Sequence, residues 1–283
     1  MSLLACPVRG CGESLARESR SFVCARRHSF DIARSGYINL LQPQDRRSPN
    51  AGDTREAVEA RTRLLASGVG RAALEAIVAR AAALDIPDNP AVVDLGCGGG
   101  ELLGALSARR PIAGIGIDLS TPAIDAAAKR YPHLTWVIAN ADRRLPVVDR
   151  SAALVLSLNG RRHPEEAARV LRANGHLIVA LPAADDLIEL REVVQGAGVE
   201  RVRSDAVIDA HAEQFTLVDR TTVRDTRTVT AEQATDLLLG TYRGRRESQA
   251  ARATDLQEMK VTLSTEVLCF TSLETTLRRR QIP

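Results

Sequence analysis

The stretch VVDLGCGGGELL, at residues 92–103, restricts the possible folds of this chain more than any other segment. The apolar run at 91–95 predicts a buried strand, and the apolar residues after the glycines recur at helical spacing. Glycine lets the backbone turn tightly and approach a ligand closely, as happens where a strand of a parallel sheet gives way to a helix. The stretch therefore predicts an α/β fold with a ligand site at the carboxyl end of this strand.

Strand-like and helix-like segments alternate after this turn, which is typical of a doubly wound parallel sheet. Further strands are predicted at 112–118, 134–139, 151–158 and 175–181, and helices at 101–108, 121–131 and 164–171. Two more helices are predicted before the first strand, at 54–68 and 71–86, and a linker or ordered loop at 42–53. Beyond residue 184 we expect a helix at 185–195, a strand near 215–223, a helix between Thr230 and Gly240, and a last strand at 260–272.

The glycine-rich turn favours an adenosyl cofactor over a dinucleotide. A dinucleotide fingerprint needs glycine at the last place of G-x-G-x-x-G, but Glu101 stands there after Gly96 and Gly98. Asp94 and Asp118 end neighbouring predicted strands, where their carboxylates can accept from an amino group and from ribose hydroxyls. The alternative is a tight strand-to-helix turn that binds nothing.

The N-terminal segment contains a second candidate site, with the spacing Cys-x4-Cys-x12-Cys-x3-His. Thiolates and an imidazole in two chelating pairs suit tetrahedral Zn²⁺. Since the protein fills all four positions, we expect a structural metal without an open place for water. The alternative is that the cysteines and the histidine only pack against one another.

Composition narrows the class of protein further. The net charge is +3, and the first 50 residues hold eight arginines against four acidic side chains. This excess permits RNA binding but is equally compatible with a solvated surface. No apolar run reaches the roughly 18 residues that a membrane span needs, and no export signal is evident, so we expect a soluble cytoplasmic protein that does not enter a membrane.

The sequences VVDLGCGGGE and GIGIDLS resemble the first two motifs of class I S-adenosylmethionine-dependent methyltransferases. The patterns F-D-x-A-x-x-G-Y-x-N-L-L at 30–41 and A-R-x-x-x-L at 60–65 resemble the bacterial 23S rRNA (guanine-N1)-methyltransferase family. This resemblance implies an α/β fold, a Rossmann-like seven-stranded class I methyltransferase sheet with a small N-terminal zinc-binding domain. The implied division is a zinc-binding RNA-recognition module at 1–36, a linker and helical segment at 37–86, and a methyltransferase domain at 87–283.

Carried onto this sequence, the resemblance implies two cofactors, S-adenosylmethionine and a structural Zn²⁺. The implied zinc ligands are Cys6, Cys11, Cys24 and His28. The implied cofactor-binding residues are Asp94, Gly96, Gly98, Gly100, Glu101, Leu102, Asp118, Asn140, Ala141 and Asp142. Asp94 and the glycines would shape the methionine end, Asp118 would hold the ribose, and 140–142 would lie at the adenine; Asp142 could equally be a simple turn former.

The reaction implied by the resemblance is methyl transfer to N1 of a guanine in the helix 35 hairpin of 23S rRNA, by an enzyme that can be a homodimer. One branch of the family confers macrolide resistance. The arginines placed to contact RNA are Arg26, Arg27, Arg34, Arg46, Arg47, Arg161 and Arg162.

The loop SLNGRRHPEE differs from the family's usual Y-A-P and leaves the catalytic residues unassigned. Asn159 and His163 are candidates in this loop, although either could instead cap a strand or a helix. Two other functions therefore stay open: a small-molecule methyltransferase, and a catalytically silent S-adenosylmethionine-binding RNA or protein adaptor.

Overall fold

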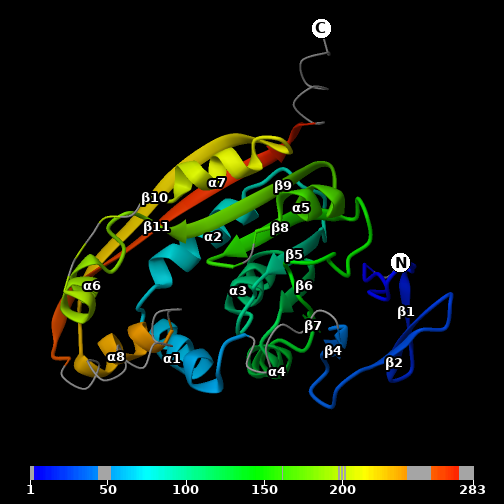
Figure 1. The fold of residues 1–283 in the computed structure, drawn as a ribbon, viewed down its shortest axis with the longest axis horizontal. Coiled ribbons are helices and arrows are strands. Elements are labelled where there is room, and N and C mark those ends of the chain that lie inside the picture. The colour runs from blue at the N-terminus through cyan, green and yellow to red at the C-terminus, as the bar shows by residue number, and fades with distance from the viewer. Residues whose placement is uncertain are drawn as a thin grey trace, which may run out of the picture.

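The computed structural model describes residues 3–43, 52–160, 162–196, 198, 200, 202–240 and 256–273. Its centre is an eight-stranded sheet with the strand order β10-β11-β9-β8-β5-β6-β7-β4 (Figure 1). The strands are β4 (Ile38–Asn39), β5 (Ala91–Leu95), β6 (Ala113–Asp118), β7 (Thr135–Ile138), β8 (Ala152–Leu158), β9 (Leu171–Pro182), β10 (Phe215–Val229) and β11 (Met259–Ser272). The strands from β4 to β9 pair in parallel, and β11 runs antiparallel to both β9 and β10.

Helices cover both faces of this sheet because its strands are apolar on both sides. They are α1 (Arg55–Ala66), α2 (Arg71–Ala82), α3 (Glu101–Arg109), α4 (Thr121–Arg130), α5 (Pro164–Val170), α6 (Ile188–Gln195), α7 (Ser204–His211) and α8 (Ala231–Leu239). Val92 packs in the core formed with α2, α3 and α4, while its neighbour Val93 packs in the core on the α5 side. This alternation fixes the register of the central strands.

The N-terminal segment with the predicted zinc ligands forms a separate three-stranded antiparallel sheet of β1 (Leu15–Glu18), β2 (Ser21–Cys24) and β3 (Ser29–Asp31). It lies beside β4 and β7 at one edge of the large sheet (Figure 1). Leu4 and Leu15 extend the α5-side core into this segment, and Leu4 also pairs with Val147 of the large domain. The small sheet is therefore held against the large one by a shared apolar core.

The hairpin of β10 and β11 extends past β9, since β11 pairs with β9 only over residues 265–271. On this extension a third apolar cluster joins α1, α6 and α8, with Leu64, Leu190 and Leu237 at its centre. Figure 1 shows α1 and α8 close together beside the carboxyl ends of the parallel strands. Helices α1 and α8 therefore lie next to the predicted ligand site.

The expected strands and helices are present, but several boundaries and elements differ. Helix α2 ends at Ala82, four residues before its predicted end, and α6 begins at Ile188, three residues after its predicted start. The sheet has the seven strands β5 to β11 and, in addition, the short strand β4, which lies in the segment expected to be linker and helix. Helix α7 was not expected. Strand β9 begins at Leu171, four residues early, and β10 continues to Val229 because β11 pairs with it along its whole length. Within the described residues, no helix is long and apolar enough to cross a membrane.

Candidate cofactor and metal sites

The four predicted zinc ligands come together at one end of the small sheet. All four ligand atoms lie within 4.8 Å of one another. Cys11 Sγ is 3.8 Å from Cys24 Sγ, and His28 Nδ1 is 3.4 Å from both Cys6 Sγ and Cys24 Sγ. A zinc tetrahedron with bonds of roughly 2.3 Å to sulfur and 2.0 Å to nitrogen has edges of about 3.8 and 3.5 Å. These residues therefore fit a zinc ion.

Backbone turns bring these side chains together. The N–H of Cys6 donates to Glu13, and the N–H of Cys24 donates to the carbonyl of His28. Arg27 closes the second turn in the left-handed region, at φ 65°. Burial raises the pKa of the Cys6 thiol to about 12, so its thiolate needs a nearby cation in order to form. A divalent metal supplies that charge.

The cofactor loop runs from Gly96 to Gly100 and is folded onto the end of β6. The N–H of Gly96 donates to the carbonyl of Ile117 over 2.8 Å, and the N–H of Gly98 donates to Asp118 Oδ2 over 3.0 Å. Gly98 has φ 54° and Gly100 has φ 82°, both in the region that favours glycine. A Cβ on Gly100 would lie 2.4 Å from the ring of Trp136, so a larger residue cannot fit there.

Asp94 is the most unusual polar group at this loop. Its side chain is 1% exposed, and its Oδ1 atom has no hydrogen-bond partner in the described part of the chain. Burial raises the pKa of Asp94 to about 8, and the nearby charges of Asp118 and Glu101 add to the effect. An orphaned buried carboxylate suits the ammonium group of an amino acid, as at the methionine end of S-adenosylmethionine.

Asp118 differs from Asp94 in its hydrogen bonding, because its carboxylate already accepts hydrogen bonds from two backbone amides. Oδ2 accepts from Gly98, and Oδ1 accepts from the N–H of Ser120 over 2.8 Å. Burial raises the pKa of Asp118, although both of these hydrogen bonds oppose the shift. Each oxygen retains acceptor capacity, which suits the hydroxyls of a ribose.

The remaining predicted cofactor residues differ in what they can contribute. Glu101 accepts from Thr62 and from Arg130 at the start of α3, whereas the Leu102 side chain is buried in the core. Asn140 follows β7 and accepts the N–H of Asp142 on its side-chain oxygen, so 140–142 form a tight turn beside Asp118. Ala141 is buried there.

The loop after β8 lies directly against the cofactor loop. A Cβ on Gly160 would come within 2.1 Å of the Leu95 carbonyl oxygen, so this backbone crosses the end of β5. Asn159 is exposed, with φ 54°, and its N–H continues the pairing with β9 by donating to Ala180. His163 occupies the N-cap position of α5, but its side chain makes no capping hydrogen bond. Its Nδ1 atom is buried and has no hydrogen-bond partner among the described residues.

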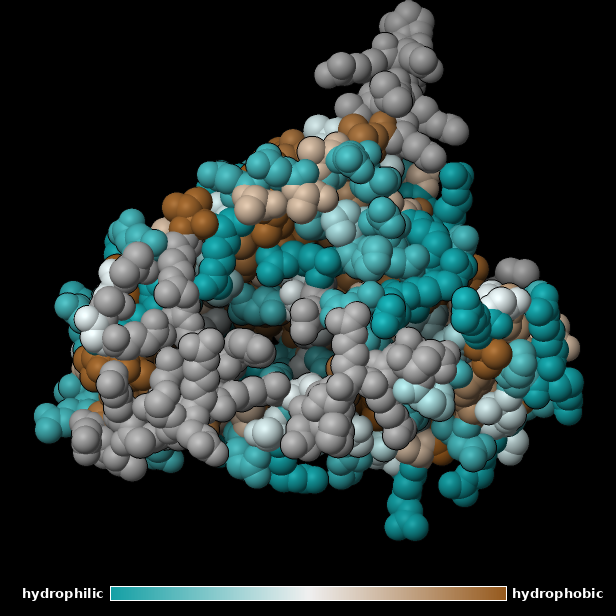
Figure 2. All heavy atoms as spheres, viewed as in Figure 1, coloured by the Kyte–Doolittle hydropathy of each residue, from teal (hydrophilic) through white to brown (hydrophobic). Residues whose placement is uncertain are grey.

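A surface hollow lies beside the ends of β8 and β9, with hydrophilic side chains above it (Figure 2).

Of the arginines expected to contact RNA, Arg46, Arg47 and Arg161 fall outside the described residues. Arg26 donates to the carbonyl of Gly10 within the small sheet. Arg27, Arg34 and Arg162 lie in described segments.

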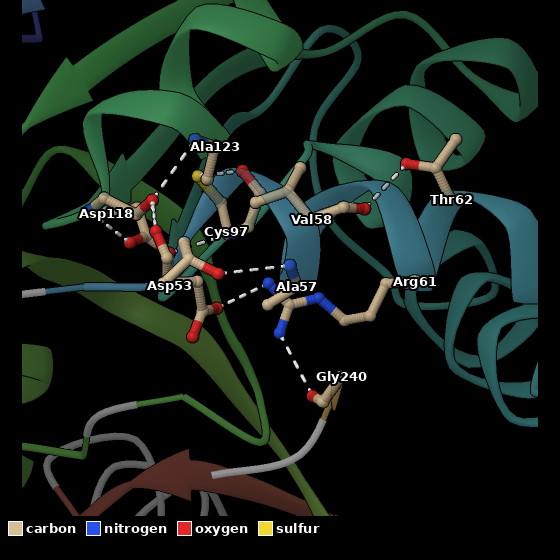
Figure 3. A network of polar contacts seen from close by, with 12 residues as sticks. Asp53, Ala57, Val58, Arg61, Thr62, Cys97, Asp118, Ala123 and Gly240 are labelled. Carbon is tan, nitrogen blue, oxygen red and sulfur yellow. Dashed lines mark hydrogen bonds and ion pairs between the residues drawn. The ribbon is translucent and has the colours of Figure 1, made fainter. Parts of the chain in front are cut away.

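Sequence reasoning missed three residues that border the cofactor loop. Arg61 of α1 pairs with Asp53 over 2.5 Å, and Ser120 Oγ donates to the carbonyl of Asp53 over 2.6 Å (Figure 3). The contact between Asp53 and Ser120 spans 67 residues, so no local pattern reveals it. The signals in the sequence were the A-R-x-x-x-L pattern, which contains Arg61, and the GIGIDLS motif, which ends at Ser120.

Two family models match the chain. One, described as RlmA, N-terminal, is a zinc ribbon and matches residues 4–49; a methyltransferase domain matches 92–175. Among solved structures, the chain is similar to a protein assigned as a methyltransferase, in complex with the Trm112 methyltransferase activator of Haloferax volcanii. The TM-score is 0.52 at 19% identity, covering 78% of this chain and 98% of that one, which shows the shared fold.

Similar sequences carry more specific names. The chain is 33% identical to a protein assigned as a 23S rRNA (guanine-N(1)-)-methyltransferase of Micromonospora griseorubida, over 83% of this chain and 84% of that one. It is 37% identical to the 23S rRNA (guanine(748)-N(1))-methyltransferase of Streptomyces fradiae, over 71% of this chain and 69% of that one. The chain therefore belongs to the 23S rRNA (guanine-N1)-methyltransferase family and is an S-adenosylmethionine-dependent methyltransferase with an N-terminal zinc ribbon.

Proposed function

We propose that this protein transfers the methyl group of S-adenosylmethionine to N1 of a guanine in the helix 35 hairpin of 23S rRNA. The observation that carries the proposal is the placement of the Asn159 loop across the end of β5, against the cofactor loop. A target base that contacts the Asn159 loop would lie next to a methyl donor bound at the cofactor loop. The Streptomyces fradiae relative, named for guanine 748, supports the choice of N1 as the methylated atom.

The cofactor residues divide by chemistry. Asp94, Gly96, Gly98 and Gly100 surround the methionine end, with Glu101 and Leu102 at the start of the following helix. Asp118 binds the ribose hydroxyls, and Asn140, Ala141 and Asp142 border the adenine. When bound, S-adenosylmethionine supplies an electrophilic methyl group on its sulfonium.

The protein must orient the guanine and accept the proton that N1 loses. The Asn159 amide can accept the N1 hydrogen through its oxygen or donate to O6 through its nitrogen. His163 offers an imidazole ring, a side chain that can accept a proton in general base catalysis. Asn159 therefore acts on orientation, and His163 is the candidate proton acceptor.

The zinc ribbon recognises the RNA. Cys6, Cys11, Cys24 and His28 hold the zinc, and the surrounding arginines contact phosphates. Neutralising phosphates makes binding salt-dependent, with affinity falling as ionic strength rises. Residues 1–36 form the RNA-recognition module, 37–86 the linker and helical segment, and 87–283 the methyltransferase domain.

Three wider aspects belong to the same proposal. The enzyme works in the cytoplasm as a homodimer, and methylation of the hairpin lowers the susceptibility of the ribosome to macrolides. Light scattering after size-exclusion chromatography measures the oligomeric state. Growth inhibition by macrolides in a strain that expresses the protein, compared with one that expresses an Asn159→Ala variant, measures resistance.

The direct experiment is primer extension across helix 35 after unmodified 23S rRNA is incubated with protein and cofactor. A methyl at N1 blocks Watson–Crick pairing, so we expect a stop that depends on the cofactor. Asn159→Ala and His163→Ala should weaken the stop while leaving cofactor affinity unchanged. If wild-type protein binds the cofactor but gives no stop on this RNA, the proposed target is wrong.

A further inference from the structure

Arg61 presents its guanidinium to the cofactor loop. It extends from α1, and its Nη2 atom lies 4.0 Å from the position that a Cβ on Gly98 would take. The side chain is 34% exposed, so it lines an accessible surface. Figure 3 shows Arg61 reaching toward Asp53, in the same network as Asp118 and Cys97.

Among the residues that the structure describes, Arg61 uses only part of its donor capacity. Nη2 donates to Asp53 Oδ2 over 2.5 Å, and Nη1 donates to the carbonyl of Gly240 over 3.3 Å. A guanidinium has five N–H donors in a fixed planar fork. The two bonds orient this fork and leave donors for a further acceptor.

The same end of the sheet collects negative charge. Asp94, Asp118 and Glu101 all lie near the loop. Burial raises the pKa of Asp94, and the charges of Asp118 and Glu101 raise it further. The amino-acid end of the cofactor carries an ammonium and a carboxylate. Asp94 suits the ammonium, but the carboxylate would be repelled by its acidic surroundings unless a cation offset its charge.

Arg61 is suitably placed to be that cation. The positive charge of Arg61 already reaches Asp118, where it lowers the pKa against the dominant effect of burial. Arg130, the last residue of α4, donates instead to Glu101 at the start of α3. We propose that Arg61 binds the carboxylate of the methionine part of S-adenosylmethionine by charge-assisted hydrogen bonds.

The segment before α1 fixes the position of Arg61. Gly52 has φ 93°, and a Cβ on it would lie 2.6 Å from the backbone of Ser120. Asp53 accepts from Ser120 Oγ through its carbonyl and from Arg61 through its side chain. Because Ser120 begins α4 beside Asp118, Arg61 is held at a set distance from the cofactor loop. Asp53 is thus a positioning residue for Arg61.

The test compares two ligands that differ in the amino-acid part. S-adenosylhomocysteine has the carboxylate and the ammonium, whereas 5′-methylthioadenosine has neither. Calorimetric titration of Arg61→Gln should show a loss of S-adenosylhomocysteine affinity of roughly tenfold to a hundredfold, the range for a charge-assisted hydrogen bond. The affinity for 5′-methylthioadenosine should stay within about twofold of wild type.

Arg63→Gln is the matched control. Arg63 lies on the same helix, α1, two residues after Arg61. It pairs with Asp236, away from the cofactor loop. This variant loses an ion pair from the same helix and should keep wild-type affinity for both ligands. Arg61→Lys, which retains charge but not the fork, should fall between wild type and Arg61→Gln.

An equal loss for both ligands in Arg61→Gln would overturn the inference, because Arg61 would then act only by holding α1. Unchanged S-adenosylhomocysteine affinity would overturn it as well. If Arg61→Gln does not fold, Arg61→Lys decides by the same ligand comparison. No RNA enters this assay, so its outcome is independent of the proposed methylation target.

Discussion

Asp94→Asn should make the protein more stable than wild type, by a margin that grows as the pH rises from 5 to 7. Asparagine has the shape of a protonated aspartic acid, and burial with neighbouring negative charge raises the pKa of Asp94 to about 8. In the unfolded chain an aspartate has a pKa of about 3.9. Between these values the folded protein retains a proton that the unfolded chain has released.

The sign of the effect follows from proton counting. Where the unfolded state binds fewer protons, stability falls as pH rises, by at most about 1.4 kcal/mol per pH unit for one group. From pH 5 to pH 7 the wild type should therefore lose up to about 3 kcal/mol of stability, because Asp94 is ionised in the unfolded chain and protonated in the folded one. Asp94→Asn escapes this loss, so the difference between the two proteins should grow by that amount.

Urea unfolding at pH 5, 6 and 7, without cofactor, measures this difference. The chain has a single tryptophan, Trp136, which is 1% exposed and contacts the glycine loop, so its fluorescence reports on the right region. Asp125→Asn is the control. The hydrogen bond from Lys129 lowers the pKa of Asp125, so this residue stays ionised in both states from pH 5 to 7 and its variant should run parallel to wild type. Parallel curves for Asp94→Asn would refute the reasoning.

Three further predictions follow from the same geometry. Binding of S-adenosylhomocysteine at pH 7 should release close to one proton in wild type and none in Asp94→Asn, measured by calorimetry in buffers of different ionisation enthalpy. Gly160→Ala, whose Cβ would collide with the Leu95 carbonyl, should abolish methyl transfer with little change in cofactor affinity; retained transfer would show that the Asn159 loop is not at the acceptor site. Cys24→Ser should lower the zinc content measured by mass spectrometry, while Cys269→Ser, far from the cluster, should not; equal zinc in both would exclude Cys24 as a ligand.

The central strands were predictable because continuous apolar runs, such as the first five residues of β8, are typical of strands buried on both faces. Strand β4 was not, since its two residues pair with β7 only when the whole sheet exists. The length of β10 was also missed: its polar side chains alternate on an edge strand, and pairing with β11 determines where it ends. Local sequence patterns therefore predicted the central strands, whereas strand pairing in the folded sheet determines the edge strands β4 and β10.

The candidate site divides in the same way. Asp94 and Asp118 could be placed from sequence because they sit where predicted parallel strands end, so they must share one edge of the sheet. The four predicted zinc ligands could be grouped from their spacing alone, and the structure brings their ligand atoms within 4.8 Å of one another. Arg61 could not be placed, because its partner Asp53 and the docking of Asp53 on Ser120 depend on the long-range packing of α1.

The central claim is methylation of guanine N1 in 23S rRNA, and the modified nucleoside itself tests it most directly. Unmodified 23S rRNA is incubated with the protein and methyl-labelled S-adenosylmethionine, digested to nucleosides, and analysed by chromatography with mass spectrometry. We predict label in 1-methylguanosine, recovered from the fragment that contains helix 35. Label in N2-methylguanosine or another nucleoside, or no labelled RNA from protein that binds the cofactor, would contradict the account.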